Sequence, residues 1–386
     1  MVNKAYYFLI TLGLTTDDKI ILFQSYMGQS YACSPKALYI QICQMDEFKD
    51  FTLVWAFRNP DEKVDPDLIK CKKVKYFSTE YFRYLGKSKY WIVNVRVPDH
   101  VIKKKDQIYV QCWHGTPLKK LGFDIDDGNN AVYTKKEMAD KYANDAKKHN
   151  FFLSPSAFAS EKFRSAFNLN QLHNHDIIIE EGYPRNDFLF LYNESDVKKI
   201  KNKLNIPENK KVILYAPTWR DNQYKSGYGY TYSLNVNFDL WREKLKEDYI
   251  VLFRAHNHVT NNFDFAKYED FIYDVTQIDD VNDCYIISDL LITDYSSVFF
   301  DYANLRRPIL FYMYDLDEYK DRMRGFYIDL NELPGPIIEN EMDLISYILS
   351  SSEIDNQEKF DRFNNKYNYL DDFDSSRRVI KKIIQV

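Results

Sequence analysis

Short runs of apolar residues recur along the whole chain and constrain its fold more than any other feature of the sequence. Most runs are continuously apolar, which is typical of parallel strands whose two faces are both buried. In the first half we predict strands over residues 20–24, 52–56, 73–77, 91–95, 108–112, 151–153 and 177–180. In the second half we predict strands over residues 212–216, 250–254, 271–273, 290–293 and 309–311.

Amphipathic stretches with plausible helix starts lie between these runs. Ser34 and Pro35 supply an N-cap and a first-turn proline, and Asn282 can cap the stretch that follows it. Strands that alternate with helices predict an α/β protein with two Rossmann-like, doubly wound domains. We place the N-terminal domain at residues 1–195 and the C-terminal domain at 196–340. Residues 341–386 are predicted to form helices that pack back on the domains.

Composition narrows the class of protein. Apolar residues make up 45% of the 386 and charged residues 28%, which favours a globular protein with a sizeable core. The five cysteines include no CxxC pair, so neither a disulfide framework nor a zinc site is expected, and a reducing cytoplasm fits them. No apolar run approaches 18 residues, which predicts no membrane-spanning helix. The Asp-x-Asp pairs are what chance supplies in an acid-rich chain, so no metal site is predicted.

The net charge of the chain is −5, but the region between Pro60 and Lys120 is basic, with 14 lysines and arginines and 7 aspartates and glutamates. A basic region on an acidic protein suggests an anionic partner, although solvated loop lysines would give the same pattern. Nucleic acid is not the expected partner, because the whole chain is acidic and carries no nucleic-acid-binding motif.

Polar turns follow four of the predicted strands, at the strand ends where ligands bind in open α/β sheets. These turns comprise residues 113–117, 217–221, 255–257 and 294–297. In the first turn, the Gly and Pro that follow His114 favour an exposed imidazole over a buried core histidine. Imidazole is the side chain best suited to take a proton from a hydroxyl near pH 7.

The other three turns carry groups that suit phosphate. Ser296 and Ser297 lie at a helix start, where hydroxyls and free N–H groups bind anions, although an ordinary N-cap explains one of them. Asp294 is expected only to orient its neighbours. Thr218 offers a hydroxyl, and Arg220 offers a bidentate phosphate binder unless it forms a surface salt bridge.

Six strings in fixed order give the chain a strong resemblance to the CDP-glycerol glycerophosphotransferase family of teichoic-acid synthesis. They are 113–124 (WHGTPLKKLGFD), 182–189 (GYPRNDFL), 215–221 (YAPTWRD), 254–257 (RAHN), 280–302 (DVNDCYIISDLLITDYSSVFFDY) and 324–338 (RGFYIDLNELPGPII). The resemblance runs from about residue 20 to the end and implies a glycosyltransferase-B-like pair of domains, with the donor nucleotide held mainly by the C-terminal one.

The resemblance also implies roles for residues of the polar turns. It points to His114 as the general base and to His256 as the group that stabilises charge on departing CMP. The residues expected to contact the CDP-alditol donor are Thr218, Arg220, Arg254, Asp294, Ser296, Ser297 and Arg324. Lys119 and Lys120 are weaker candidates for phosphate of the acceptor.

The reaction implied is transfer of glycerol phosphate or ribitol phosphate from a CDP-alditol to a hydroxyl of a lipid-linked acceptor, with release of CMP and no cofactor. A polyprenyl-diphosphate-linked acceptor would place the protein on the inner, anionic face of the cell membrane as a peripheral protein, and a homo-oligomer is possible. Two alternatives stay open: a nucleotide-sugar glycosyltransferase of the same architecture, and a catalytically silent polymer- or membrane-binding relative. Dehydrogenases, P-loop ATPases, zincins and α/β-hydrolases lack their signatures here.

Overall fold

The computed structural model describes residues 4–125, 134–218, 224–225, 229–230, 235–255, 264–317, 325–350 and 357–384. The chain forms two compact units. Unit 1 comprises Met1–His114, Ala139–Phe190 and Tyr369–Val386, and unit 2 comprises Gly115–Met138 and Leu191–Asn368. The predicted division at residue 195 lies close to the one at Phe190. Residues 341–386 were predicted to pack back on the domains, and their last part, Tyr369–Val386, belongs to unit 1. The membership of Gly115–Met138 in unit 2 was not predicted.

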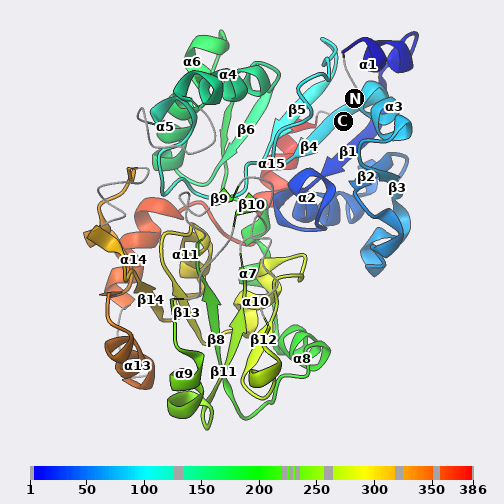
Figure 1. Ribbon diagram of the computed structural model, residues 1–386. Coiled ribbons are helices and arrows are strands. Elements are labelled where there is room, and N and C mark those ends of the chain that lie inside the picture. The colour runs from blue at the N-terminus through cyan, green and yellow to red at the C-terminus, as the bar shows by residue number, and fades with distance from the viewer. Residues whose placement is uncertain are drawn as a thin grey trace. The chain divides into compact units, whose positions relative to one another are not determined.

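Unit 1 is built on a parallel sheet with the strand order β3-β2-β1-β4-β5-β6-β7 (Figure 1). Its strands are β1 (Asp17–Gln24), β2 (Thr52–Phe57), β3 (Lys72–Lys75), β4 (Ser88–Val93), β5 (Ile108–Gln111), β6 (Phe151–Ser154) and β7 (Ile178–Glu180). Each coincides with a predicted strand to within a few residues, and the order doubles back on either side of β1 and β4. This confirms the doubly wound parallel sheet.

The apolar run Ile20–Phe23 within β1 is buried on both faces. Ile21 and Phe23 pack into a core with residues of α2 and α15, whereas Ile20 and Leu22 pack with residues of α1 and α3 on the other face. Successive side chains of a strand point to opposite faces, so both sets of side chains in this run are buried in apolar cores.

The described helices of unit 1 include α4, which contains the division between Met138 and Ala139. They are α1 (Lys4–Thr11), α2 (Cys33–Cys43), α3 (Thr79–Lys87), α4 (Lys135–Ala146), α5 (Ala157–Ala166), α6 (Leu169–Leu172), α7 (Phe188–Leu191) and α15 (Ser375–Ile383).

Unit 2 contains a second parallel sheet, with the strand order β12-β11-β8-β13-β14-β15. Its strands are β8 (Lys211–Ala216), β11 (Tyr249–Phe253), β12 (Ile272–Asp274), β13 (Leu290–Thr293), β14 (Ile309–Tyr312) and β15 (Ile337–Ile338); β9 (Tyr224–Lys225) and β10 (Gly229–Tyr230) form a separate hairpin. The described helices are α8 (Glu194–Lys203), α9 (Phe238–Leu245), α10 (Val281–Ile287), α11 (Val298–Tyr302), α13 (Glu341–Ser350) and α14 (Gln357–Tyr367). The two-residue strand β15 and the hairpin were not predicted.

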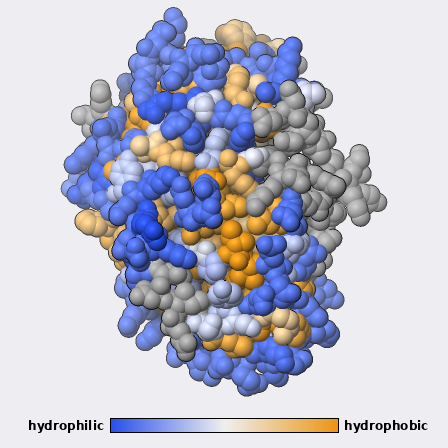
Figure 2. Space-filling view, turned by 90° about the vertical axis from the view of Figure 1, so that its left-hand side faces the viewer, coloured by the Kyte–Doolittle hydropathy of each residue, from blue (hydrophilic) through white to orange (hydrophobic). Residues whose placement is uncertain are grey.

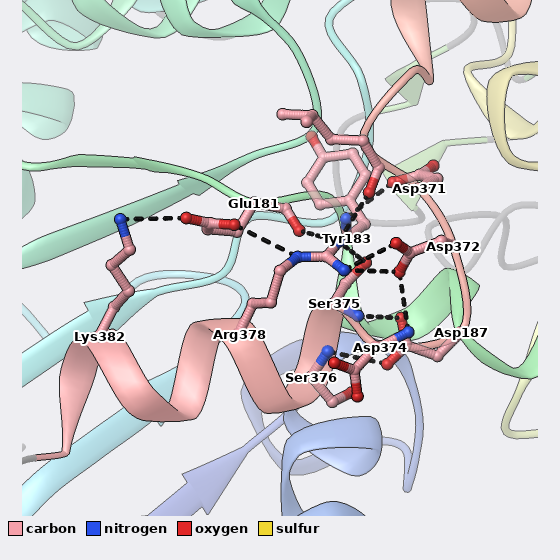
Figure 3. Close-up of polar contacts among 11 residues, drawn as sticks. Glu181, Tyr183, Asp187, Asp371, Asp372, Asp374, Ser375, Ser376, Arg378 and Lys382 are labelled. Carbon is pink, nitrogen blue, oxygen red and sulfur yellow. Dashed lines mark hydrogen bonds and ion pairs between the residues drawn. The ribbon is translucent and has the colours of Figure 1, made fainter.

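The C-terminal segment returns to unit 1 and is fastened there by polar contacts around the start of α15 (Figure 3). Asp187 accepts hydrogen bonds from the backbone N–H groups of Ser375 (3.2 Å) and Ser376 (2.8 Å). Arg378 Nη1 donates to both carboxylate oxygens of Asp372, at 2.9 and 2.7 Å. Gly182 has φ +85°, and a Cβ there would lie 2.4 Å from the carbonyl oxygen of Leu370, so only glycine fits.

The described part of the chain contains no helix that is both long enough and apolar enough to span a bilayer. Hydrophilic residues cover most of the face shown in Figure 2, and hydrophobic residues gather in patches among them. This distribution agrees with the mean hydropathy of −0.50.

Candidate functional site

His114 lies just beyond the carboxyl end of β5, as the sequence predicted, and its side chain is exposed. Trp113 precedes it with φ +47°, a left-handed conformation that is rare for a large aromatic residue. The imidazole lies over the Trp113 indole with the ring centroids 4.2 Å apart. The exposed ring is therefore presented to solvent from a backbone held in an unusual conformation.

A hydrogen bond to the main chain fixes which nitrogen of His114 carries the proton. His114 Nδ1 lies 2.9 Å from the carbonyl oxygen of Asn94, which follows β4. A carbonyl oxygen only accepts, so Nδ1 of the neutral ring is the donor and Nε2 is the acceptor nitrogen. That is the tautomer a general base needs, because Nε2 can then take a proton from a hydroxyl.

Asn94 is a site residue that the sequence analysis missed. It is fully buried, and its Oδ1 accepts a hydrogen bond of 2.8 Å from the backbone N–H of Tyr26, which follows β1. The ring of Tyr26 lies edge-on to the His114 ring at a centroid distance of 6.1 Å. The sequence held one sign of this role: Asn94 is a polar residue inside the predicted strand 91–95, and a buried amide usually forms hydrogen bonds with nearby groups.

In unit 2, Thr218 and Asp294 are brought together from the ends of β8 and β13. Asp294 Oδ1 accepts hydrogen bonds from the backbone N–H (2.8 Å) and the hydroxyl (2.6 Å) of Thr218 and from the N–H of Tyr295 (2.6 Å). Both side chains are buried, with 5% of Thr218 and 2% of Asp294 exposed. Asp294 thus orients Thr218, whose hydroxyl proton points at the carboxylate.

Ser296 and Ser297 are half-buried and immediately precede α11. Ser297 makes no side-chain cap bond, and Ser296 Oγ accepts a long hydrogen bond of 3.5 Å from the N–H of Val298. Gly115, the first residue of unit 2, comes so close that a Cβ there would lie 2.7 Å from Ser297 Oγ. Because α11 has only five residues, the hydroxyls matter more here than a helix dipole.

Arg254 follows β11 and is half-buried. Its Nη1 donates to the carbonyl oxygen of Val275 and its Nη2 to that of Ile278, both at 2.8 Å. These bonds tie the end of β11 to the loop after β12. A contact between Arg254 and the donor stays a prediction, and it would have to involve the parts of the guanidinium that these carbonyls leave available.

Lys119 and Lys120 lie in a short strand-like pairing within unit 2. Lys119 forms an isolated antiparallel bridge with Phe326, and the N–H of Lys120 donates to the carbonyl oxygen of Gly325 at 2.8 Å. Gly325 is adjacent in the chain to Arg324. His256, Arg220 and Arg324 themselves lie outside the described residues.

Each unit therefore offers a different chemistry at the carboxyl ends of its strands. Unit 1 presents His114, held by Asn94, as a proton acceptor. Unit 2 presents serine hydroxyls next to the buried pair of Thr218 and Asp294, which suits an anionic ligand. The roles of the individual residues stay predictions.

Known proteins resemble the chain over almost its full length. The family described as CDP-Glycerol:Poly(glycerophosphate) glycerophosphotransferase matches residues 6–385. A teichoic acid poly(glycerol phosphate) polymerase of Bacillus spizizenii is 37% identical over 96% of this chain and 93% of its own. A teichoic acid glycerol-phosphate transferase of Staphylococcus aureus is 38% identical over 97% and 95%. A solved structure of the wall teichoic acid polymerase TagF with CDPG superimposes with a TM-score of 0.89 at 34% identity, covering 98% of this chain and 92% of that one.

Proposed function

The chain belongs to the CDP-Glycerol:Poly(glycerophosphate) glycerophosphotransferase family, and from this premise we propose that it transfers an alditol phosphate from a CDP-alditol to a growing polymer. The relatives that carry the argument are glycerol-phosphate polymerases and transferases of teichoic acid synthesis. We propose CDP-glycerol or CDP-ribitol as donor, and a hydroxyl of a lipid-linked polymer as acceptor. No cofactor takes part in this scheme.

The proposed step is a displacement at the β-phosphorus of the donor. The acceptor oxygen forms a new P–O bond, the bond between that phosphorus and the bridging oxygen breaks, and CMP leaves with the bond's electron pair. His114 Nε2 takes the proton of the acceptor hydroxyl. The observation that supports this role is the 2.9 Å contact between His114 Nδ1 and the Asn94 carbonyl, because it makes Nε2 the accepting nitrogen of the neutral ring.

We propose that unit 2 holds the donor through Ser296 and Ser297, with Thr218 and Asp294 shaping the site beside them. The serine hydroxyls have little bonding of their own and can donate to a diphosphate. We further propose that His256, Arg220 and Arg324 supply positive charge or hydrogen bonds to the phosphates. Positioning and charge stabilisation, with little covalent chemistry from the protein, suffice for phosphoryl transfer.

Incubation with a panel of donors tests the function. CDP-glycerol, CDP-ribitol, UDP-sugars and GDP-sugars are each offered with a lipid-linked acceptor, and released nucleotides are separated by chromatography. CMP release from a CDP-alditol, reduced about 100-fold or more in His114→Ala, is expected. UDP or GDP release would identify a glycosyltransferase instead, and an inert protein would favour the non-catalytic alternative. The exposed His175, whose replacement by alanine should leave turnover unchanged, provides the matched control.

We also propose that the protein meets its acceptor at an anionic membrane surface, but not through every lysine of the basic region. Lys103 Nζ donates to the carbonyl oxygen of Gln107 at 2.8 Å. Lys104 Nζ donates to those of Leu14 (2.5 Å) and Gly86 (2.7 Å). These two lysines therefore stabilise unit 1 through hydrogen bonds to its backbone. Reversing their charge would destabilise unit 1 whether or not lipid binds.

The exposed lysines of the same region give a sharper test. Lys70, Lys75 and Lys105 are exposed, and each lysine near an anionic bilayer contributes about 1 kcal/mol. Replacing all three with glutamate should weaken salt-sensitive cosedimentation with vesicles that contain phosphatidylglycerol. Binding that ignores both the lipid charge and the three substitutions would count against this proposal.

A further inference from the structure

We propose that Gln111 is a positioning residue for His114, an inference that rests on the proposed role of His114 as general base. Gln111 is the last residue of β5 and is 1% exposed. It is a polar residue inside the otherwise apolar run 108–112. A buried amide must find hydrogen-bond partners, and those of Gln111 are the backbone segments that carry His114 and Asn94.

One end of the amide holds the backbone that leads into His114. Gln111 Oε1 accepts a hydrogen bond of 2.9 Å from the N–H of Trp113. Trp113 has φ +47°, a conformation that a bulky residue keeps only where its surroundings hold it. The bond to Gln111 restrains this residue, which is peptide-bonded to His114.

The other end of the amide holds the backbone next to the partner of His114. Gln111 Nε2 donates to the carbonyl oxygen of Val95 at 3.0 Å and to the hydroxyl oxygen of Tyr109 at 3.3 Å. Val95 is adjacent to Asn94, whose carbonyl oxygen receives His114 Nδ1. Gln111 therefore joins the neighbours of the two residues that form the His114–Asn94 hydrogen bond.

This link begins where regular sheet pairing stops. The β4–β5 register ends with Val93 opposite Gln111, followed by a bond of 2.8 Å from the N–H of Cys112 to the carbonyl oxygen of Val93. Beyond that point the side chain of Gln111 continues the connection between the two segments. Its removal would leave the strands paired while loosening the segments from which His114 and Asn94 approach each other.

The partner Tyr109 is itself fixed. Its hydroxyl donates to Asp145 Oδ2 at 3.1 Å, and the same carboxylate oxygen lies 3.0 Å from His149 Nε2. All three side chains are buried. A side chain anchored in this way can hold the amide of Gln111 in one orientation, which is what positioning requires.

The test is a double-mutant cycle of Gln111→Ala with His114→Ala, using the donor found by the panel above. If Gln111 acts through His114, Gln111→Ala should lower kcat about 10- to 100-fold while the Kd for the CDP-alditol, measured by calorimetry, changes less than twofold. In the His114→Ala background the same substitution should cause no further loss, because the group it positions is absent.

Gln107, which immediately precedes β5, provides a matched control. It is fully buried, its Oε1 accepts from the N–H of Lys104, and its Nε2 donates to the carbonyl oxygens of Leu85 and Ser88. Gln107→Ala should lower the melting temperature about as much as Gln111→Ala does, with kcat unchanged. If Gln111→Ala does not fold, the cycle is run with Gln111→Glu, which keeps the size and an acceptor oxygen.

Two results would overturn the inference: a kcat for the Gln111 variant equal to that of Gln107→Ala, or losses that simply add in the double variant. Full activity of His114→Ala would instead remove the proposed base, whatever Gln111 does. The two failures are therefore distinguishable.

Discussion

Two hydroxyl groups after β13 contribute little to the capping of α11. Ser297 makes no side-chain cap bond, and the only bond to Ser296 Oγ from the following N–H is 3.5 Å long. Ser78 shows what a capping serine looks like in the same protein, because it accepts from the N–H of Tyr81 at 3.1 Å at the start of α3. A serine that does not cap its helix is free to serve a ligand.

We therefore predict that Ser296→Ala combined with Ser297→Ala weakens CDP-alditol binding by about 1–3 kcal/mol, since donors to a charged diphosphate are lost. The melting temperature should hardly change. Calorimetric titration with the donor measures the first quantity, and thermal unfolding measures the second. Ser78→Ala should do the reverse, costing about 1 kcal/mol of stability through loss of a cap without altering donor affinity. Unchanged donor affinity in the double variant would show that the serines do not bind the donor.

Arg254 shows where sequence reasoning stops at the scale of a residue. Its place after a predicted strand and within a family string suggested a phosphate ligand, and the position after β11 is as expected. The two carbonyl groups that it contacts belong to Val275 and Ile278. Such partners are set by how the loop after β12 folds back, which no local pattern encodes.

At the scale of elements, α15 depends on a carboxylate from elsewhere in the chain. The backbone N–H groups of Ser375 and Ser376, in the first turn of α15, donate hydrogen bonds to the carboxylate of Asp187. Asp374, which directly precedes the helix, makes no side-chain cap bond. Burial raises the pKa of Asp187 to about 6, although the hydrogen bonds from Ser376 and Ser375 oppose this shift. Asp187 is 7% exposed, so ionising it in place is costly.

The raised pKa predicts a pH-dependent contribution to stability. Between the ordinary aspartate pKa of about 3.9 and the folded value of about 6, the folded chain binds more protons at this site than the unfolded chain. The contribution is thus fully present below the unfolded pKa and is lost as pH rises through about 6.

Asp187→Asn cannot titrate, so the stability of wild type relative to this variant should fall between pH 4 and pH 7. Urea unfolding at several pH values, followed by circular dichroism, measures this difference. Parallel pH profiles of the two proteins would contradict the assignment.

For the whole molecule, the sequence predicted the two sheets and a C-terminal tail that packs back on the domains, but not that Gly115–Met138 belongs to unit 2. The strands were predictable because each is a buried apolar run, as Ile20–Phe23 in β1 illustrates with residues packed on both faces. The segment Gly115–Met138 belongs to unit 2, although the residues on both sides of it belong to unit 1. The segment Tyr369–Val386 belongs to unit 1, although the residues before it belong to unit 2. They do so through contacts such as Lys120 with Gly325 and Asp187 with Ser376, which join residues about 200 positions apart.

The return of the C-terminal segment makes unit 1 depend on the end of the chain. Val379, Ile380 and Ile383 of α15 are at most 2% exposed and pack with residues of α2 and the sheet. Each fully buried aliphatic side chain contributes about 1.5–3 kcal/mol. Their joint removal is comparable to the whole unfolding free energy of a typical protein, about 5–15 kcal/mol.

We predict that truncation after Asn368, or the single substitution Ile380→Asp, unfolds unit 1 while unit 2 keeps its sheet. Hydrogen exchange followed by mass spectrometry separates the two outcomes, because peptides covering β1 and β2 should lose protection while those covering β8 and β11 retain it. Lys381→Asp changes an exposed position of the same helix and should leave both sets protected. Equal loss of protection in both units would mean that the protein unfolds as a single cooperative body. Full protection of β1 in the truncated chain would mean that the sheet of unit 1 is stable without α15.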